Sequence, residues 1–198
     1  MIEIELKIKI DAASAEKLTK WLKQNAEAKG EKHQLEYYLD NPDKTFFFQS
    51  ELGYKDAANY FRVRFSDKGD SVCLKIFEVD PKSTKSKNLD EIEFTVSDGE
   101  ESLKLFKTLG FTDLTKVEKT RKSYAYKNFE IELDTVEGLG NFVEIEIKEN
   151  DITVEEGKAK IRELLKQIGI TRFQNCSRGY VSMLWNPDYE FGEEEEIS

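Results

Sequence analysis

Apolar and polar residues alternate along many segments of the chain, beginning with IEIELKIKI at residues 2–10. A period of two places apolar side chains on one side of a β-strand and polar side chains on the other. The pattern predicts eight strands, at residues 2–10, 33–40, 59–66, 71–79, 89–96, 114–126, 129–136 and 142–148. Short turn sequences such as Asp67-Lys68-Gly69 connect several of them, which favours antiparallel pairing.

Between the strands, capping residues predict three helices and a fourth, shorter one. The N-terminal signals are Asp11 or Ser14, the pair Asp98 and Glu101, and the pair Thr153 and Glu156. We expect the first helix to run to about Asn25, the second to stop at Gly110 and the third to end near Gly169. A short helix is expected over residues 177–185. The fold class is therefore α+β, and eight antiparallel strands are enough to close a β-barrel.

Composition limits the partners and the compartment. The 198 residues carry a net charge of −10, which argues against bulk attraction to nucleic acid or to an anionic membrane. No apolar run approaches the ~20 residues of a membrane span, and the N-terminus lacks the pattern of a signal peptide. The two cysteines, Cys73 and Cys176, are expected to be free thiols in the cytoplasm. We expect one domain over residues 1–188 and a disordered acidic tail over 189–198.

Each predicted strand carries its charges at i, i+2 spacing, so they project from one side, and the signs are sorted by strand. The acidic strands contribute Glu3, Glu5, Glu91, Glu93, Glu130, Glu132, Asp134, Glu144 and Glu146, and the basic positions are Lys7, Arg62, Arg64, Lys75, Lys119 and Arg121. Two carboxylates about 7 Å apart on one strand repel by roughly 2 kcal/mol at an effective dielectric of about 20. A solvent-facing surface avoids this repulsion by mixing signs. Sorted charges instead suit an internal cavity that binds a metal cation and a polyanion, with the apolar sides facing outward under the helices.

The charged segments resemble, in order, the motifs of the CYTH superfamily, also called triphosphate tunnel metalloenzymes. The match starts with Glu3-x-Glu5-x-Lys7 and continues through FRVRF, CLKIF, DEIEF, EKTRKSY, ELDTVEGLGNFVEIE and SRGYVSML. Any one of these motifs is weak, whereas the collinear set covers nearly the whole chain. The resemblance implies a closed eight-stranded antiparallel barrel with a charged lumen and helices packed outside.

The resemblance also implies the roles of individual residues, with Mg²⁺ or Mn²⁺ as the cofactor. It implies metal ligands at Glu3, Glu5, Glu144 and Glu146, triphosphate contacts at Lys7, Arg62, Arg64, Lys75, Lys119, Arg121 and Arg178, and catalytic roles for Glu5, Lys7, Lys119 and Asp134. Relatives are often dimeric, which leaves a homodimer open. The only histidine, His33, is expected at the surface, and Tyr124 and Tyr126 are expected to pack.

Three functions fit these residues. The first is a hydrolase acting on inorganic, nucleoside or thiamine triphosphate, which needs acids for the metal, basic clamps and water. The second is a class IV adenylyl cyclase that converts ATP to cyclic AMP and pyrophosphate. The stretch EYYLDNPDKTFFF is similar to a cyclase element but has Glu36 where cyclases have Asp. The third is a protein that binds polyphosphate or a phosphorylated ligand without turnover.

Overall fold

The computed structural model describes residues 4–79, 82 and 86–197, and this part of the chain is a mixed α+β structure with a large antiparallel sheet. Ten strands hydrogen-bond in the order β12-β11-β1-β10-β9-β8-β2-β5-β6-β7, and β3 pairs separately with β4. The strands are β1 (Ile4–Ile10), β2 (Glu27–Asp40), β3 (Phe47–Gln49), β4 (Lys55–Ala57), β5 (Asn59–Ser66), β6 (Asp70–Val79), β7 (Ser86–Val96), β8 (Thr112–Tyr126), β9 (Phe129–Val136), β10 (Gly140–Ile147), β11 (Arg172–Cys176) and β12 (Gly192–Glu196). The helices are α1 (Ala12–Asn25), α2 (Gly99–Thr108), α3 (Val154–Ile168) and α4 (Tyr180–Trp185).

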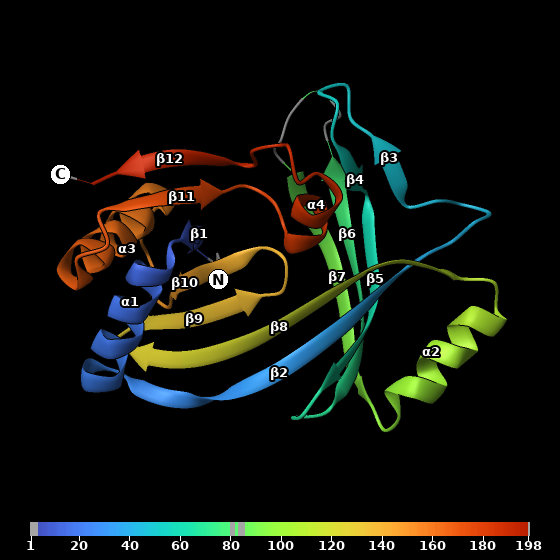
Figure 1. Ribbon diagram of the computed structural model, residues 1–198, viewed down its shortest axis with the longest axis horizontal. Helices are drawn as coiled ribbons and strands as arrows, with labels where there is room; N and C mark the ends of the chain where they lie inside the picture. Colours follow the sequence, from blue (N-terminus) through green and yellow to red (C-terminus); the bar gives the residue numbers. More distant parts are fainter. Residues whose placement is uncertain (1–3, 80–81, 83–85, 198) are drawn as a thin grey trace. The chain divides into compact units, whose positions relative to one another are not determined.

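The chain forms two compact units. Unit 1 consists of Met1–Glu31, Thr120–Ser177 and Gly192–Ser198, and unit 2 consists of Lys32–Lys119 and Arg178–Phe191. Strands β2 and β8 each run from one unit into the other. Unit 1 holds α1 and α3, and unit 2 holds α2 and α4 (Figure 1).

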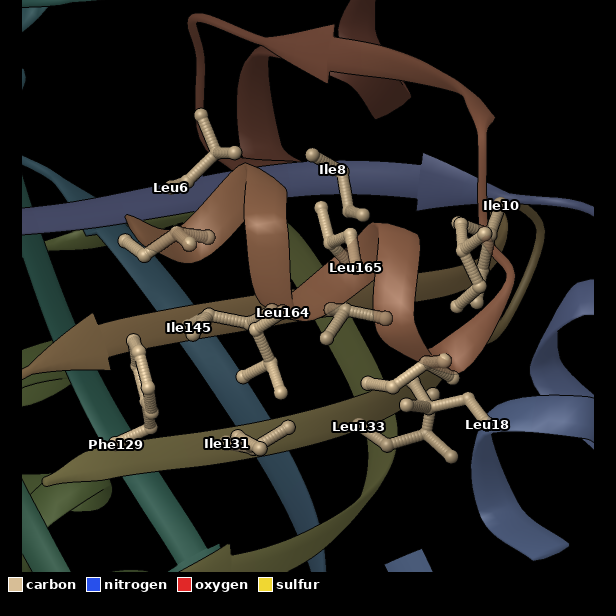
Figure 2. Close-up of a cluster of buried hydrophobic side chains, with 14 of the residues drawn as sticks. Leu6, Ile8, Ile10, Leu18, Phe129, Ile131, Leu133, Ile145, Leu164 and Leu165 are labelled. Carbon is tan, nitrogen blue, oxygen red and sulfur yellow. The ribbon is translucent and has the colours of Figure 1, made fainter. Parts of the chain in front are cut away.

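The core of unit 1 forms where the apolar sides of β1, β9 and β10 meet α1 and α3. Ile8, Ile131, Ile145, Leu18 and Leu165 are fully buried there, and the strand side chains point towards the helix side chains (Figure 2). Full burial of one such side chain contributes about 1.5–3 kcal/mol. The alternation thus places the charged side chains of these three strands on the face away from the helices.

Local signals fix where the helices of unit 1 begin and end. Asp11 caps α1 by accepting a hydrogen bond from the backbone N–H of Ser14 at 2.6 Å. The capping box of Thr153 and Glu156 is complete at the start of α3. Gly157 lets α3 approach β1, because a Cβ at this position would lie 2.7 Å from an Ile4 methyl group. In the described part of the chain, no helix has both the length and the apolar character needed to cross a membrane.

A second core lies in unit 2, on the apolar sides of β2, β5 and β6. Leu39, Val63 and Val72 are buried there, and Phe61 stacks edge-on against Phe106 of α2 at a centroid distance of 4.8 Å. Asp98 caps α2 by accepting a hydrogen bond from the Glu101 N–H at 2.9 Å. Strand β5 turns into β6 through Lys68 and Gly69, whose φ of 116° favours glycine. In unit 2, as in unit 1, the charged sides of the strands lie opposite a helix-covered face.

All eight predicted strands are present, and the predicted helices are found as α1 to α4. The sequence analysis missed β3, β4 and β11, which have only three to five residues each and no sustained alternation. The acidic tail was expected to be disordered, but Gly192–Glu196 form β12 and pair with β11. Its Glu195 accepts hydrogen bonds from Arg162 of α3 and Asn175 of β11, which offset the repulsion within the acidic run.

Candidate functional site

The charged side of the unit 1 strands is a compact set of cross-strand rows, which we call the unit 1 face. Its residues are Glu5 and Lys7 of β1, Arg121 of β8, Glu130, Glu132 and Asp134 of β9, and Glu144 and Glu146 of β10. Antiparallel register places Glu5 opposite Glu146 and Lys7 opposite Glu144. The next pairing places Glu146 opposite Glu130 and Glu144 opposite Glu132. Directly opposite residues have Cβ atoms about 5 Å apart, so each row is one continuous cluster.

The first row consists of three carboxylates, Glu5, Glu146 and Glu130. Lys148 pairs with Glu146 at 2.6 Å and with Glu130 at 3.5 Å, while Glu5 is exposed. Like charges directly opposite one another are destabilising, and a bound cation would relieve the repulsion. The donors are all carboxylate oxygens, the ligand type that Mg²⁺ and Mn²⁺ prefer. The chemistry of these donors therefore suits a divalent metal, although their oxygens do not all lie within 4.8 Å of one another and would have to move together to share one ion.

The second row is neutralised by two cations. Lys7 Nζ lies 2.7 Å from Glu144, and Arg121 contacts both oxygens of buried Asp134, at 2.6 and 2.5 Å. Arg121 also contacts Glu144 at 2.7 Å and pairs with Glu132. Burial lowers the pKa of Arg121, but these three carboxylates outweigh burial and raise it; Glu144 likewise raises the pKa of Lys7 against burial. A phosphate bound by either cation would have to exchange with these carboxylates.

The unit 2 face is the charged side of β2, β5, β6 and β7 together with Lys119. Its centre is Glu36, which is only 1% exposed. Arg64 Nε donates to Glu36 at 2.7 Å, the Tyr38 hydroxyl donates to it at 2.7 Å, and an Arg62 nitrogen lies 3.8 Å away. Burial would raise the pKa of Glu36, but Arg62, Lys119 and Arg64 hold the pKa at about 2. The buried Glu36 carboxylate is thus a counter-ion for Arg62, Arg64 and Lys119, which are three of the residues predicted to contact the triphosphate.

The other cations of the unit 2 face lie beside carboxylates of β7 or an aromatic ring. Lys75 pairs with Glu91 at 2.9 Å, and Arg64 Nη1 donates to Glu93 at 3.3 Å. Lys119 is 6% exposed, and its ammonium lies 5.0 Å from the centre of the Tyr180 ring. Arg62, Arg64, Lys75 and Lys119 therefore lie on one charged face within unit 2, and their role as triphosphate contacts stays a prediction.

Arg178 has a different environment from the other predicted substrate contacts. It is 6% exposed, pairs with fully buried Asp56 of β4 at 3.1 Å and donates to the Tyr54 hydroxyl at 2.9 Å. Ser182 of α4 donates to the same Asp56 at 2.9 Å. These contacts attach the start of α4 to β4. A substrate contact by Arg178 remains a prediction, and it would require this buried pair to open.

Cysteine and two glutamates form the one group of His, Cys, Asp and Glu side chains close enough to share a metal among the described residues. Cys73 Sγ and oxygens of Glu91 and Glu93 lie within 4.8 Å of one another. Burial raises the pKa of the Cys73 thiol to about 11, so it is protonated near neutral pH and donates to Glu91 at 3.6 Å. Metal ligation needs the thiolate. The group as it stands is a hydrogen-bonded thiol, and a metal bound there would have to displace the thiol proton.

Several smaller predictions can be compared directly with the structure. Both cysteines are free, as predicted. His33 is exposed and lies 2.9 Å from Glu118, and Tyr124 and Tyr126 pack in or against the unit 1 core. Glu3, a predicted metal ligand, lies outside the described residues.

Sequence reasoning missed the central role of Glu36. A usable signal was present, because Gln34, Glu36 and Tyr38 alternate in β2. The pairing of Glu36 with Arg64 and of Tyr38 with Arg62 depends on strand register.

The family model of the CYTH domain matches residues 1–180. This chain belongs to the CYTH-domain family, whose members are metal-dependent enzymes of the triphosphate tunnel type acting on small-molecule triphosphates.

A protein of Methanocaldococcus jannaschii whose name suggests an adenylate cyclase is 31% identical, over 92% of this chain and 98% of the relative. The solved structure of PH1012 from Pyrococcus horikoshii is 26% identical with a TM-score of 0.66, covering 91% of this chain and 98% of that one. The Hippeastrum protein HpAC1 shares the fold at 17% identity and a TM-score of 0.67, covering 95% of this chain and 97% of that one. HpAC1 is described as an adenylyl cyclase with a dominant triphosphatase activity.

Proposed function

We propose that this protein hydrolyses a small-molecule triphosphate with the help of Mg²⁺ or Mn²⁺. The observation that carries the proposal is the set of four cations on the unit 2 face: Arg62, Arg64, Lys75 and Lys119. Arg62, Arg64 and Lys75 lie beside carboxylates and Lys119 lies beside the Tyr180 ring, so binding would exchange these contacts for phosphate oxygens. Membership of the CYTH family supports the same substrate class.

The cations of the unit 2 face bind and orient the triphosphate. Arg64 presents a planar guanidinium that suits a phosphate better than a point charge does. Lys119, held beside the Tyr180 ring and the negative charge of Glu36, supplies a nearly buried ammonium. Charges in such a water-poor position stabilise a phosphoryl transition state more strongly than exposed charges do.

The carboxylates of the unit 1 face would hold the divalent cation through Glu5, Glu144 and Glu146, with Glu3 as the further predicted ligand. When bound, the cation supplies charge neutralisation and lowers the pKa of a water. Arg121 and Lys7 fix the orientation of Glu144. Asp134 in turn accepts hydrogen bonds from Arg121 through both of its carboxylate oxygens. This arrangement assigns Lys7 and Asp134 positioning roles beside the reacting groups.

Hydrolysis requires that a water oxygen bonds to a phosphorus atom while a bridging P–O bond breaks. The electron pair of that bond leaves with the departing phosphate group, and the proton of the water passes to solvent. Positioning and charge neutralisation account for most of the acceleration in such reactions. The proposal includes closure of the antiparallel sheet into a tunnel, as membership of the CYTH family suggests.

Cyclisation of ATP is the second candidate, and the name of the M. jannaschii relative favours it. In that reaction the ribose 3′-oxygen attacks the α-phosphorus and pyrophosphate leaves. The cation set and the acidic row would serve both reactions, so the products distinguish them.

A substrate panel tests the proposal. The purified chain is incubated with tripolyphosphate, ATP, GTP and thiamine triphosphate in Mg²⁺, Mn²⁺ or EDTA, and the products are separated by anion exchange. Hydrolysis predicts phosphate release that EDTA abolishes. Cyclic AMP with pyrophosphate would instead support the cyclase. A Lys75→Ala variant is expected to lose activity, whereas Lys104→Ala, on the α2 side of the sheet, is the matched control.

A further inference from the structure

Unit 2 contains a polar pocket of about 370 Å³ next to the β5–β6 turn. Its walls include Lys32 and Gln34 of β2, Arg64 of β5, Lys68 in the turn, Ser71 of β6 and Glu93 of β7. Arg64 belongs to both the unit 2 face and the wall of the pocket. The pocket therefore adjoins the proposed phosphate contacts within the same unit.

The pocket carries a positive charge in a protein whose net charge is −10. Three of its lining residues, Lys32, Arg64 and Lys68, are cationic, and Glu93 is the one acid among them. Glu93 already accepts hydrogen bonds from Arg64 at 3.3 Å and from the Ser71 hydroxyl at 3.0 Å. By contrast, the side chains of Lys32 and Lys68 form no ion pair with any described residue. The pocket thus offers two uncommitted ammonium groups.

Gln34 provides a second, independent indication of a ligand. Its side chain is 2% exposed, and its Oε1 atom is buried with no hydrogen-bond partner among the described residues. Leaving a buried amide oxygen unpaired is unfavourable, because the oxygen loses its hydrogen bonds to water and gains none in the protein. A ligand with both acceptor and donor oxygens would complete this site. The oxygens of a terminal phosphate accept hydrogen bonds from the cations, and its singly protonated form, with a pKa near 6, also donates one through its P–OH group.

We propose that this pocket binds the terminal phosphate of the triphosphate substrate. This inference rests on the proposed function and extends it by fixing the direction of the substrate. The terminal phosphate lies at the β5–β6 turn, and any nucleoside lies at the other end of the triphosphate. Phe94 is the one aromatic residue among the described residues lining the pocket, so its walls suit an anion better than a base.

Binding measurements with capped and uncapped ligands test the direction. Dissociation constants for tripolyphosphate, ATP and diadenosine triphosphate, which lacks a terminal phosphate, are measured calorimetrically in EDTA for the wild type and Lys32→Ala/Lys68→Ala. The double variant is expected to bind tripolyphosphate and ATP at least tenfold more weakly. Its affinity for the capped ligand should change less than twofold. Equal weakening for all three ligands, or for none, would overturn the proposal.

Controls separate the pocket from general charge effects. Lys104→Ala removes an exposed lysine of the same unit on the α2 side, and it should leave all three dissociation constants within twofold of the wild type. Lys68 is exposed and Lys32 is half-buried, so the double variant is expected to fold, which a thermal melt checks. A control that weakens binding as strongly as the double variant contradicts a specific pocket.

Orthophosphate and sulfate test the pocket without any turnover. Amide resonances of Gly69 and Ser71 are followed by NMR at pH 7 during titration with each anion. Phosphate should bind at least threefold more tightly than sulfate, which has no hydroxyl group at this pH. Gln34→Leu should remove the preference, and equal binding of the two anions by the wild type would contradict the role of Gln34. Phosphate binding here without triphosphate turnover would reject the proposed function alone, whereas turnover unaffected by these variants would reject the pocket alone.

Discussion

The two charged faces are built in the same way but differ in what balances their charges. On the unit 1 face, the six acids Glu5, Glu130, Glu132, Asp134, Glu144 and Glu146 lie around three cations, Lys7, Arg121 and Lys148. On the unit 2 face, Arg62, Arg64, Lys75 and Lys119 lie around three acids, Glu36, Glu91 and Glu93. The excess is negative on the first face and positive on the second. This difference shows that similar acidic residues have different candidate roles. In unit 1 they are candidate metal ligands, and in unit 2 they are counter-ions that balance the basic side chains.

Replacing the counter-ion of the unit 2 face should have the largest effect on stability. Glu36→Gln removes the buried charge beside Arg62, Arg64 and Lys119, and we expect the free energy of unfolding to fall by about 3–5 kcal/mol. Denaturant titration measures the loss. Tripolyphosphate should restore more stability to this variant than to the wild type, because the anion replaces the missing charge.

The matched control is Glu118→Gln, which removes an exposed acid paired with His33 in the same unit. A change below about 1 kcal/mol is expected there. An equal loss of unfolding free energy in the two variants would show that Glu36 is no more important to stability than an exposed acid. Glu36 would then not be a structural counter-ion of the unit 2 face.

Lowering the pH should destabilise unit 2 because Glu36 becomes protonated. The folded pKa of Glu36 is about 2, below its ordinary value of 4.5, so ionised Glu36 stabilises the fold above pH 4.5. This contribution, about 3 kcal/mol, is lost as the pH falls from 4.5 through 2. Unfolding of the wild type and of Glu36→Gln is compared at pH 6, 4 and 3, and the difference between them should shrink. A constant difference would place the pKa of Glu36 near its ordinary value in the folded protein.

The alternation in the sequence was sufficient to predict the eight long strands and the sides on which their charges lie. Glu5 and Lys7 project from the same side of β1 because the period of a strand is fixed. Grouping Arg62, Arg64 and Lys75 required only the short turn that joins β5 to β6 in an antiparallel pair. These features depend on local geometry, which sequence determines directly.

The contacts of Glu36 and Arg178 could not be predicted in this way. Glu36 meets Arg64 only because β2 pairs with β5, although the intervening chain contains β3 and β4. Arg178 is buried against Asp56, which is more than a hundred residues away in sequence. Strand β12 was unexpected because its acids are stabilised by Arg162 and by pairing with β11, both products of tertiary structure.

On the unit 1 face, a single acid should affect activity and leave stability nearly unchanged. Glu5→Gln removes an exposed carboxylate that faces Glu146, so the repulsion in that row decreases. If Glu5 is a metal ligand, kcat/KM with Mg²⁺ should fall about 100-fold, equivalent to about 2.7 kcal/mol. Steady-state kinetics at several Mg²⁺ concentrations measure the fall. Glu155→Gln, at the exposed start of α3, is the control, and full activity in Glu5→Gln would remove Glu5 from the site.

The smallest effect is expected for an acid that belongs to neither face. Glu195 of β12 pairs with Arg162 of α3, and both side chains are partly exposed. Solvent screens such a pair, so Glu195→Gln should lower the free energy of unfolding by about 1 kcal/mol or less and leave activity unchanged. Denaturant titration and the triphosphate assay check both values. A loss as large as that of Glu36→Gln would mean that β12 is as important to the fold as the buried counter-ion, and burial would then no longer explain the contrast between the acids.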